Sequence, residues 1–375
     1  MVFVMTVTII LAVAVFGQQR TAIFVVHPKD SAAGEHARAL VSVRHEFPQG
    51  VFTAEVPLVR YQELSRFADL EPVPLYHVSG KPAPATRTCT PSTQRPWGVS
   101  RVNGGLGGLG IRVAVLDTGT MTKHFDVKNR VVDCKDFTKG FTVQKGCSDG
   151  NGHGTHVAGT ILADKGSDGK GITGVAPQAS LLAYKVCGND GSCWSDDIAA
   201  AMRYAADKGV HIVSMSLGGD SPVSIMRDAV SYASGKGVLI VAAAGNDGPT
   251  DGTIDYPGAY PEVVAVAATD SADAVASFSS RGINYDTTPF SNEERDVEFA
   301  APGVQVESTW NDGCYRTISG TSMATPHISG LAAALWQGTA SATRTFLQDN
   351  ARAGLDLGRA GDDPDAGFGM PVKLQ

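Results

Sequence analysis

The sequence has no excess of basic residues and no apolar run long enough to cross a membrane. Its 38 aspartates and glutamates outnumber its 31 lysines and arginines, which gives a net charge of −7. No basic surface is therefore expected to attract nucleic acid or anionic lipid, and neither is predicted as a partner. The longest mostly apolar run, Val2–Phe16, falls short of the ~20 residues that a spanning helix needs.

That N-terminal run resembles the core of a secretory signal peptide. The basic residues that usually precede such a core are missing, so an atypical signal, a misassigned start or an uncleaved membrane anchor remain alternatives. We expect export, with residues 1–17 as the signal peptide, a secreted product and no stable membrane association.

The cysteine content fits an oxidising compartment, since six cysteines are present. None of them has the spacing of a convincing zinc site. The sequence does not decide whether Cys89 and Cys314 pair with each other. The other four bracket two short loops and are predicted as disulfides: Cys134 with Cys147, and Cys187 with Cys193.

The first part of the chain has the pattern of a small α+β module with two helices on one face of a sheet. Residues 79–96 are rich in proline, threonine and serine and are typical of an exposed linker. The module's strands are expected at 22–26, 50–56 and 73–78, and its helices at 32–43 and 58–69.

From about residue 97 the pattern changes to apolar strands that alternate with helices, which predicts a doubly wound, mainly parallel α/β sheet. In such sheets the reactive groups gather beyond the carboxyl ends of the strands. Asp117, Ser216 and Asn246 each fall at or just after such an end. The expected strands are 111–116, 180–186, 211–215, 238–243 and 263–268. One helix is expected to begin near residue 153, and two others to run over 196–208 and 222–236.

Two residues have the chemistry of a proton-transfer pair. Asp117 ends an apolar strand and could orient an imidazole through its Nδ1–H, although a turn aspartate is the simpler interpretation when the residue is taken alone. His153 lies between glycines and fits a general base. His156, three residues on, raises the alternative of a metal site, but the glutamate of an H-E-x-x-H helix is missing. We expect His156 to be a core histidine.

Two further residues have the chemistry of a nucleophile and an oxyanion donor. Ser322 precedes a helical run of small and apolar residues, so its hydroxyl is expected at a helix N-terminus, where the backbone favours negative charge. The alternative is a plain N-cap. Asn246 follows a buried strand and small residues, and its amide could donate to a developing oxyanion, with an Asx turn as the alternative.

Taken together, these segments resemble the subtilisin-like serine proteases, the subtilases, in wording and in the chain order Asp, His, Asn, Ser. The resemblance covers residues from Pro96 to the C-terminus. It implies that Asp117, His153 and Ser322 form a catalytic triad and that Asn246 donates to the oxyanion. The segments that carry the resemblance are Val115-Leu116-Asp117-Thr118-Gly119, His153-Gly154-Thr155-His156-Val157-Ala158-Gly159-Thr160, Ser214-Met215-Ser216-Leu217-Gly218-Gly219, Ala243-Ala244-Gly245-Asn246 and Gly320-Thr321-Ser322-Met323-Ala324-Thr325-Pro326-His327.

The resemblance also assigns substrate contacts, in which P1 is the residue that supplies the attacked carbonyl and S1 is the pocket for its side chain. Ser216, Leu217 and Gly218 match the strand that pairs with substrate backbone. Ala243, Ala244 and Gly245 match one wall of S1. Asp255 aligns with the base of S1, where many relatives carry glycine, so we expect some acceptance of a basic or polar P1 residue.

The N-terminal module resembles the inhibitory propeptide of this family, a ferredoxin-like chaperone that docks its C-terminal strand in the active site. The implied organisation is a propeptide at 18–80, a linker with the processing region at 81–96 and a catalytic domain at 97–375. Processing is expected between His77 and Gln94, at a bond that the sequence does not identify. An ordinary accessory domain is the alternative.

Structural calcium is likewise implied by the family, and no catalytic metal is expected. Asp126 matches the position of a common calcium-ligand aspartate. Asp164 and Asp168 lie in an oxygen-rich loop of the kind that hard cations require. This loop is longer than the typical version and carries lysines, so solvated surface carboxylates are the alternative for both residues.

The sequence therefore predicts a secreted, self-processing serine endopeptidase, expected to be monomeric, with protein chains as substrates and its own propeptide as an inhibitor. An inactive binding homologue is a second hypothesis, against which the intact triad argues. An esterase with the α/β-hydrolase fold is a third, but that fold needs G-x-S-x-G and the order Ser, acid, His, whereas Ser322 comes last here.

Overall fold

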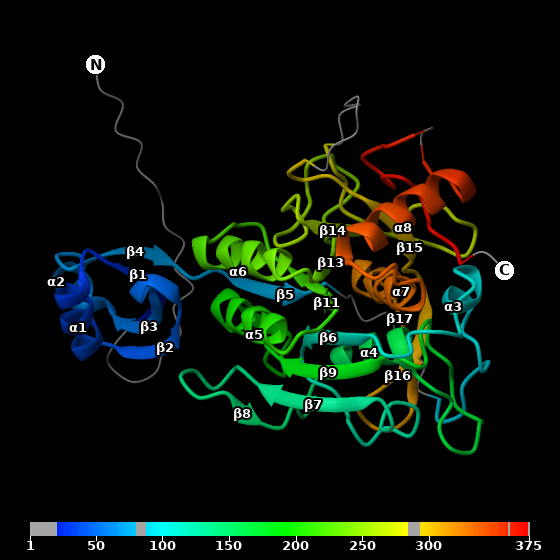
Figure 1. Cartoon of the computed structure of the whole chain (residues 1–375), viewed down its shortest axis with the longest axis horizontal. Coiled ribbons are helices and arrows are strands. Elements are labelled where there is room, and N and C mark those ends of the chain that lie inside the picture. Colours follow the sequence, from blue (N-terminus) through cyan, green and yellow to red (C-terminus); the bar gives the residue numbers. More distant parts are fainter. Residues whose placement is uncertain (1–20, 80–87, 284–292, 359–360, 374–375) are drawn as a thin grey trace. The chain divides into compact units, whose positions relative to one another are not determined.

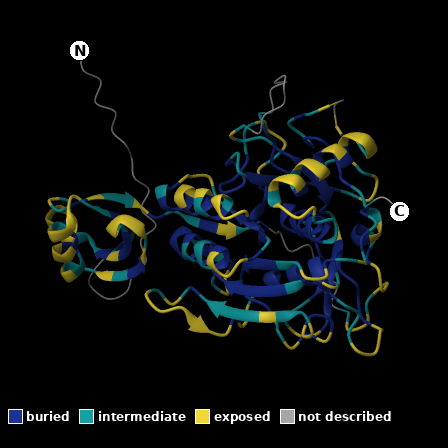
Figure 2. Cartoon of the chain, in the orientation of Figure 1, coloured by how far each residue is buried: buried dark blue, intermediate teal, exposed yellow. Residues whose placement is uncertain are grey.

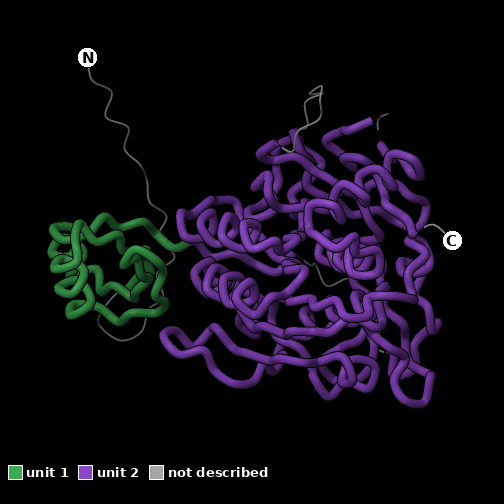
Figure 3. Tube along the Cα trace, viewed as in Figure 1, with its two compact units in different colours: residues 1–73 green, residues 74–375 purple. Residues whose placement is uncertain are grey.

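The computed structural model describes residues 21–79, 88–283, 293–358 and 361–373 (Figure 1). The chain forms two compact units, residues 1–73 and residues 74–375 (Figure 3). The predicted signal peptide and residues 81–87 of the predicted linker lie outside the described residues. The boundaries of signal, propeptide, linker and catalytic domain stay predictions.

The first unit is a four-stranded antiparallel sheet with strand order β2-β3-β1-β4. Helix α1 begins where the Asp30 carboxylate accepts a hydrogen bond from the Ala33 N–H at 2.8 Å, a side-chain N-cap. Phe24, Phe52 and Leu64 are buried in its core. Its elements are β1 Thr21–Pro28, α1 Ser31–Leu40, β2 Ser42–Glu46, η1 Pro48–Gly50, β3 Phe52–Pro57, η2 Leu58–Arg60, α2 Tyr61–Leu64 and β4 Ala68–Pro72.

The helix expected over 58–69 is wrong in its second half. Helix α2 ends at Leu64, and the Phe67 N–H donates to the Leu64 carbonyl in a tight turn. Residues 68–72 then form an edge strand that pairs with β1. Sheet pairing satisfies these backbone groups, so tertiary contacts override the helical pattern of the sequence.

The second unit contains an eight-stranded sheet with the order β15-β14-β13-β11-β6-β9-β7-β8. Every neighbouring pair is parallel except β7 and β8. Strands β11, β13 and β14 are buried along their whole length (Figure 2), as expected for parallel strands covered on both faces. The predicted α/β architecture is confirmed. The strands are β6 Arg112–Asp117, β7 Val131–Asp136, β8 Gln144–Lys145, β9 Ser180–Lys185, β11 Ile212–Met215, β13 Leu239–Ala243, β14 Val263–Thr269 and β15 Phe299–Pro302.

Two pairs of helices cover this sheet, α4 with α7 and α5 with α6. Helix α7 also contacts β11, β13, β14 and β15 and is buried almost throughout, because small residues let it approach the strands closely. None of the helices in the described part of the chain is long and apolar enough to span a membrane. The helices are α3 Trp97–Arg101, α4 His153–Leu162, α5 Ser195–Asp207, α6 Ser224–Gly235, α7 Thr321–Ala334 and α8 Ala340–Gly354.

Two small antiparallel sheets complete the second unit. Strand β5, Leu75–Val78, lies between β10, Ser192–Trp194, and β12, Leu217–Gly218. The sequence assigned this segment to the closing strand of the small module, but in the structure it pairs only with strands of the second unit. The other sheet is a hairpin of β16, Val306–Thr309, and β17, Tyr315–Ile318.

Three disulfides join segments of the second unit. They include both pairs predicted from the short loops, and they also pair the two cysteines that the sequence left unassigned. The bridge between Cys89 and Cys314 has a sequence separation of 225 residues. It connects the segment after β5 to the loop of the β16–β17 hairpin. The bridges are Cys134–Cys147, Cys187–Cys193 and Cys89–Cys314.

Candidate active site

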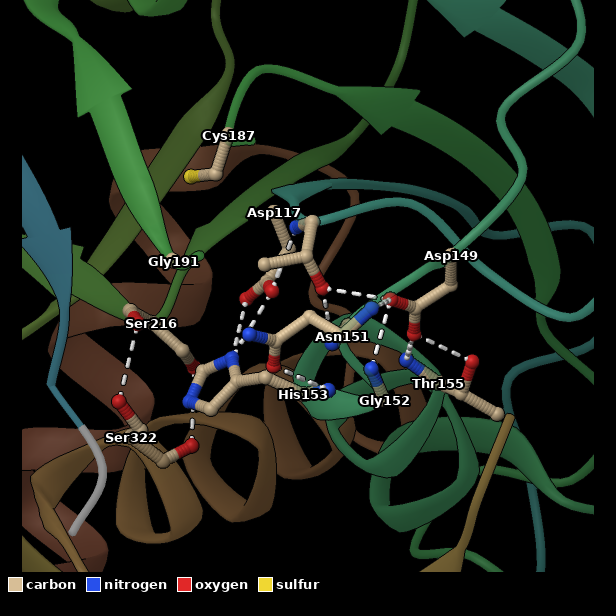
Figure 4. A network of polar contacts seen from close by, with 12 residues as sticks. Asp117, Asp149, Asn151, Gly152, His153, Thr155, Cys187, Gly191, Ser216 and Ser322 are labelled. Atoms are coloured by element: carbon tan, nitrogen blue, oxygen red, sulfur yellow. Dashed lines mark hydrogen bonds and ion pairs between the residues drawn. The ribbon is translucent and has the colours of Figure 1, made fainter. Parts of the chain in front are cut away.

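Asp117 and His153 form a buried pair at the carboxyl edge of the large sheet (Figure 4). Asp117 ends β6, and His153 is the first residue of α4. The His153 Nδ1 atom lies 2.8 Å and 3.0 Å from the two carboxylate oxygens of Asp117. This geometry holds the imidazole through Nδ1 and leaves Nε2 as the atom that can accept a proton. Nε2 has no hydrogen-bond partner among the described residues.

A second carboxylate, Asp149, fixes the turn that presents His153. One of its oxygens accepts hydrogen bonds from the Gly152 N–H at 2.7 Å and the Thr118 hydroxyl at 2.9 Å. The other accepts from the N–H and the hydroxyl of Thr155, at 3.0 Å and 2.6 Å. Gly152 has φ of 109°, a conformation that favours glycine. Asp149 is absent from the residues predicted from the sequence, although an aspartate at the start of a Gly-Asn-Gly turn is a recognisable Asx-turn signal.

Ser322 lies in the first turn of α7 and is tied to Ser216 by two hydrogen bonds. Its hydroxyl donates to the Ser216 carbonyl at 2.9 Å, and the Ser216 hydroxyl donates to the Ser322 carbonyl at 2.9 Å. The second bond is possible because residue 326, four positions on, is a proline without an N–H to bond that carbonyl. Helix α7, which begins at Thr321, packs against α4, which begins at His153. The Ser322 hydroxyl is turned toward Ser216 (Figure 4).

Two donors converge on one oxygen position next to Ser322. The Asn246 Nδ2 atom lies 2.6 Å from the carbonyl oxygen of Ser79, and the Ser322 backbone nitrogen lies 3.4 Å from the same oxygen. The Asn246 Oδ1 atom accepts from the Thr321 N–H at 3.0 Å, which fixes the amide orientation. Donors that converge on a carbonyl in this way are the arrangement that stabilises an oxyanion.

Strand β5 brings Ser79, the residue that follows it, to this position because β5 pairs with β10 on one side and with β12 on the other. His77 pairs with Ser192 of β10 and with Gly218 of β12. The Ser79 N–H donates to the Ser216 carbonyl at 3.3 Å. The sequence indicates the edge at Ser216, Leu217 and Gly218 but not the opposite edge at residues 191–194. Main-chain pairing on both sides is a general way to hold an extended peptide.

The segments expected to line S1 lie next to Ser79, with Asp255 between them. Ala243 and Ala244 are buried. A Cβ atom on Gly245 would come within 2.8 Å of the Asp255 Oδ2 atom, and one on Gly218 within 2.9 Å, so Asp255 lies against both segments. Burial, with the neighbouring Asp247 and Asp220 charges, raises the pKa of Asp255 to about 7.

The remaining buried histidines near the site have structural contacts. The His156 Nε2 atom lies 3.0 Å from the Val306 carbonyl, and burial lowers the pKa of His156 to about 3. The His327 Nδ1 atom lies 2.8 Å from the Met323 carbonyl, and burial lowers its pKa to about 4. Over the described ranges, neither histidine converges with other possible metal ligands.

The three aspartates considered as calcium ligands make different contacts. The Asp126 Oδ1 atom is buried and has no hydrogen-bond partner among the described residues. It lies against Gly171, at the end of the loop expected to hold the cation. Asp164 instead makes an ion pair with Arg130 at 2.9 Å, and Asp168 accepts from the Lys170 N–H within its own loop. Of these three aspartates, Asp126 is therefore the one that presents an unsatisfied buried oxygen to the loop.

The comparisons with known proteins agree with this geometry. The profile described as "Subtilase family" matches residues 108–369. The protein named "Subtilisin" from Bacillus sp. (strain TA39) is 42% identical over 367 residues, which cover 90% of this chain and 87% of that protein. "Subtilisin Savinase" from Lederbergia lenta is 44% identical over 248 residues, 64% of this chain and 84% of that protein.

Solved structures show the same fold at similar identity. "Sphericase" has a TM-score of 0.73 and 49% identity, covering 76% of this chain and 99% of that chain. "S41 Psychrophilic Protease" has a TM-score of 0.72 and 46% identity, with the same two shares covered. The resemblance inferred from the sequence motifs is confirmed. The chain belongs to the subtilase family and is a subtilisin-type serine endopeptidase.

Proposed function

We propose that this protein is a secreted, autoprocessed endopeptidase that cleaves protein chains through an acyl-enzyme formed on Ser322. The His153 Nε2 atom takes the hydroxyl proton of Ser322 and later returns it to the leaving amine. Asp117 holds the imidazole and stabilises its charged form. The Asn246 amide and the Ser322 N–H stabilise the negative oxygen of the tetrahedral intermediate, and water then hydrolyses the acyl-enzyme.

The observation that carries this proposal is the position of the Ser79 carbonyl. Its oxygen accepts from Asn246 at 2.6 Å and faces the Ser322 N–H at 3.4 Å. A peptide carbonyl held by these donors beside a serine and a histidine has the placement of a substrate that awaits attack. Attack requires the Ser322 hydroxyl to leave the Ser216 carbonyl, to which it donates at 2.9 Å, so that its proton can pass to His153.

Ser79 is then the P1 residue, and Ser79–Gly80 is the bond that the enzyme processes. Strand β5 fills the edge between β10 and β12, so it would exclude other substrates until it leaves. The segment before this bond accordingly acts as the inhibitory propeptide. The proposed bond lies between His77 and Gln94, the range in which the sequence predicts processing.

Processing at Ser79–Gly80 can be tested with Ser322→Ala. The wild-type protein should be recovered with a new N-terminus at Gly80, whereas Ser322→Ala should keep residues before Gly80 attached because it lacks the nucleophile. Edman sequencing and intact mass of both secreted proteins measure this. Ser341→Ala removes the hydroxyl of an exposed serine in α8 and is the matched control, whose trimming should equal that of wild type. Identical trimming of Ser322→Ala would show that another protease does the work.

The oxyanion role of Asn246 predicts a selective loss of kcat. Asn246→Ala should lower kcat by about 10²–10³ with little change in KM, the loss known for the equivalent asparagine of a subtilisin. The exposed Asn129 provides a control, and Asn129→Ala should leave kcat within about twofold of wild type, as for a substitution away from the site. Steady-state kinetics on a peptide amide check both values. A KM effect without a kcat effect would contradict the assignment.

We also propose that calcium binds at Asp126, with carbonyl oxygens of the loop 164–171 as further ligands. The buried, unpartnered Oδ1 atom of Asp126 supports this, since hard cations favour carboxylate and carbonyl oxygens. Bound calcium would tie this loop to Asp126 and so stabilise the folded state. No step of the reaction depends on it.

Removal of calcium should therefore lower thermal stability without changing the chemistry of Ser322. Enzyme blocked with a fluorophosphonate should lose several degrees of Tm in EDTA and regain them when calcium is restored. Asp126→Asn should have a low Tm that calcium does not change, whereas Asp168→Asn should respond like wild type if its carboxylate is a surface group. Differential scanning calorimetry makes the comparison. A calcium response retained in Asp126→Asn would place the ion elsewhere.

A further inference from the structure

Three aspartates meet beside Gly218 and Gly245, which lie in the two segments that flank Ser79. Asp220 follows β12, Asp247 follows the oxyanion residue Asn246, and Asp255 precedes the turn into β14. One carboxylate oxygen of each lies within 4.8 Å of the others. Asp220 and Asp247 are exposed, whereas Asp255 is only 7% exposed. This acidic trio, defined as Asp220, Asp247 and Asp255, therefore has one buried member and two at the surface.

The carboxylate of Asp255 has no hydrogen bond or ion pair with any residue that the structure describes. Its Oδ2 atom lies near the glycine positions 218 and 245, one on each segment that flanks Ser79. A side chain on either glycine would come into contact with this carboxylate. The group is therefore directed into the space between the two segments, which is where a P1 side chain would enter.

A carboxylate in this position favours a cation. Burial and the like charges of Asp247 and Asp220 raise the pKa of Asp255 to about 7. Ionisation is therefore unfavourable while the site is empty and becomes favourable when a positive charge enters. Among the described residues, Asp247 and Asp220 are the charged groups that shift the pKa of Asp255.

We propose that the acidic trio forms a cation-selective S1 site that takes the side chain of lysine or arginine at P1. This inference rests on the proposed function, since it needs Ser79 to mark P1. The long apolar stem of either side chain would lie along Ala243 and Ala244 while its charged end reaches Asp255. Asp220 and Asp247 add attraction for the cation at the mouth of the site.

The residue that occupies P1 in the structure does not use this site. Ser79 has a short, uncharged side chain, and no hydrogen bond joins it to Asp255 in the part of the chain that the structure describes. Processing within one chain tolerates a poor P1 residue, because the tether already holds the bond near Ser322 at a high effective concentration. Little binding energy from the P1 side chain is then needed. Substrates in solution lack this tether and depend on S1.

The preference for a basic P1 residue should increase with pH. Below about pH 7 a proton on Asp255 leaves the base of the site neutral, so apolar P1 residues compete better. Above it the carboxylate is ionised and attracts the cation. The ratio of kcat/KM for two substrates that differ only at P1 isolates this effect, because any pH dependence of the steps that both substrates share cancels in the ratio.

The experiment compares peptide substrates with Arg, Lys, Phe or Leu at P1 between pH 5.5 and 9. For wild type, the Arg/Phe ratio should rise about tenfold or more through neutral pH. In Asp255→Asn the ratio at pH 8 should fall roughly tenfold to hundredfold, the range for loss of a charge-assisted hydrogen bond, and its pH dependence should flatten. Asp251→Asn, at an exposed position outside the trio, should leave the ratio unchanged.

A second variant tests the coupling within the trio. Asp247→Asn removes a like charge, so the pKa of Asp255 should fall and the midpoint of the Arg/Phe transition should move to lower pH. An unchanged midpoint, or a shift to higher pH, would contradict the joint action of these carboxylates. Asp251→Asn again provides the charge-matched control.

The unpaired state of Asp255 also predicts a pH-dependent stability. The folded protein holds this proton up to about pH 7, whereas the unfolded chain releases it near pH 3.8. Ionisation therefore opposes folding increasingly between these values and by a constant amount above them. In fluorophosphonate-blocked enzyme, Asp255→Asn should raise Tm by several degrees at pH 8 and change it little at pH 4. A pH-independent difference would mean that Asp255 has a partner and would overturn the proposal.

Active-site titration separates the two proposals. If the fluorophosphonate labels Ser322 in every variant but the Arg/Phe ratio is the same in wild type and Asp255→Asn, the S1 inference is wrong and the proposed function stands. If wild type is not labelled, the proposed function itself fails.

Discussion

The arrangement of the active site depends on one property of the large sheet, which is that its parallel strands end at the same edge. Strands β6 and β13 both pair with β11, so the groups that follow these strands are neighbours in space. Asp117, Ser216 and Asn246 are brought together in this way from distant parts of the sequence. The edge is open because the strand ends are not covered by the helix pairs that pack on the faces of the sheet.

The helices that begin at this edge supply the other two groups. His153 and Ser322 lie in the first turns of α4 and α7, which pack against each other. Their positions depend on local features rather than on the sheet alone. Asp149 holds the turn before α4 through main-chain and side-chain donors, and the missing N–H of Pro326 lets Ser216 bond the Ser322 carbonyl. The backbone that presents each of these two side chains is thus held by a residue to which the proposed function gives no part in proton transfer.

Main-chain and side-chain recognition are separate at this site. Strand β5 is held by backbone hydrogen bonds from two strand edges, which any extended peptide can make. The Ser79 carbonyl has its donors, while Asp255 remains without a partner among the described residues. The same edges can therefore hold a segment with a small residue at the position of Ser79, and we propose that the carboxylates beside them distinguish between substrates. In the proposed function, the first property serves processing and the second serves specificity.

The sequence by itself determined the α/β class and the chemical groups available to the site, because buried parallel strands leave continuous apolar runs and glycine-rich turns mark their ends. It was insufficient for residues 65–72 and for Leu75–Val78, whose pairing depends on distant strands, and for Asp149, whose donors are assembled by folding. Only the tertiary structure decided that the Ser79 carbonyl meets the Asn246 amide and that three aspartates from separate segments converge. Such distances depend on contacts between residues far apart in the chain, whereas periodicity and motif spacing record only local order.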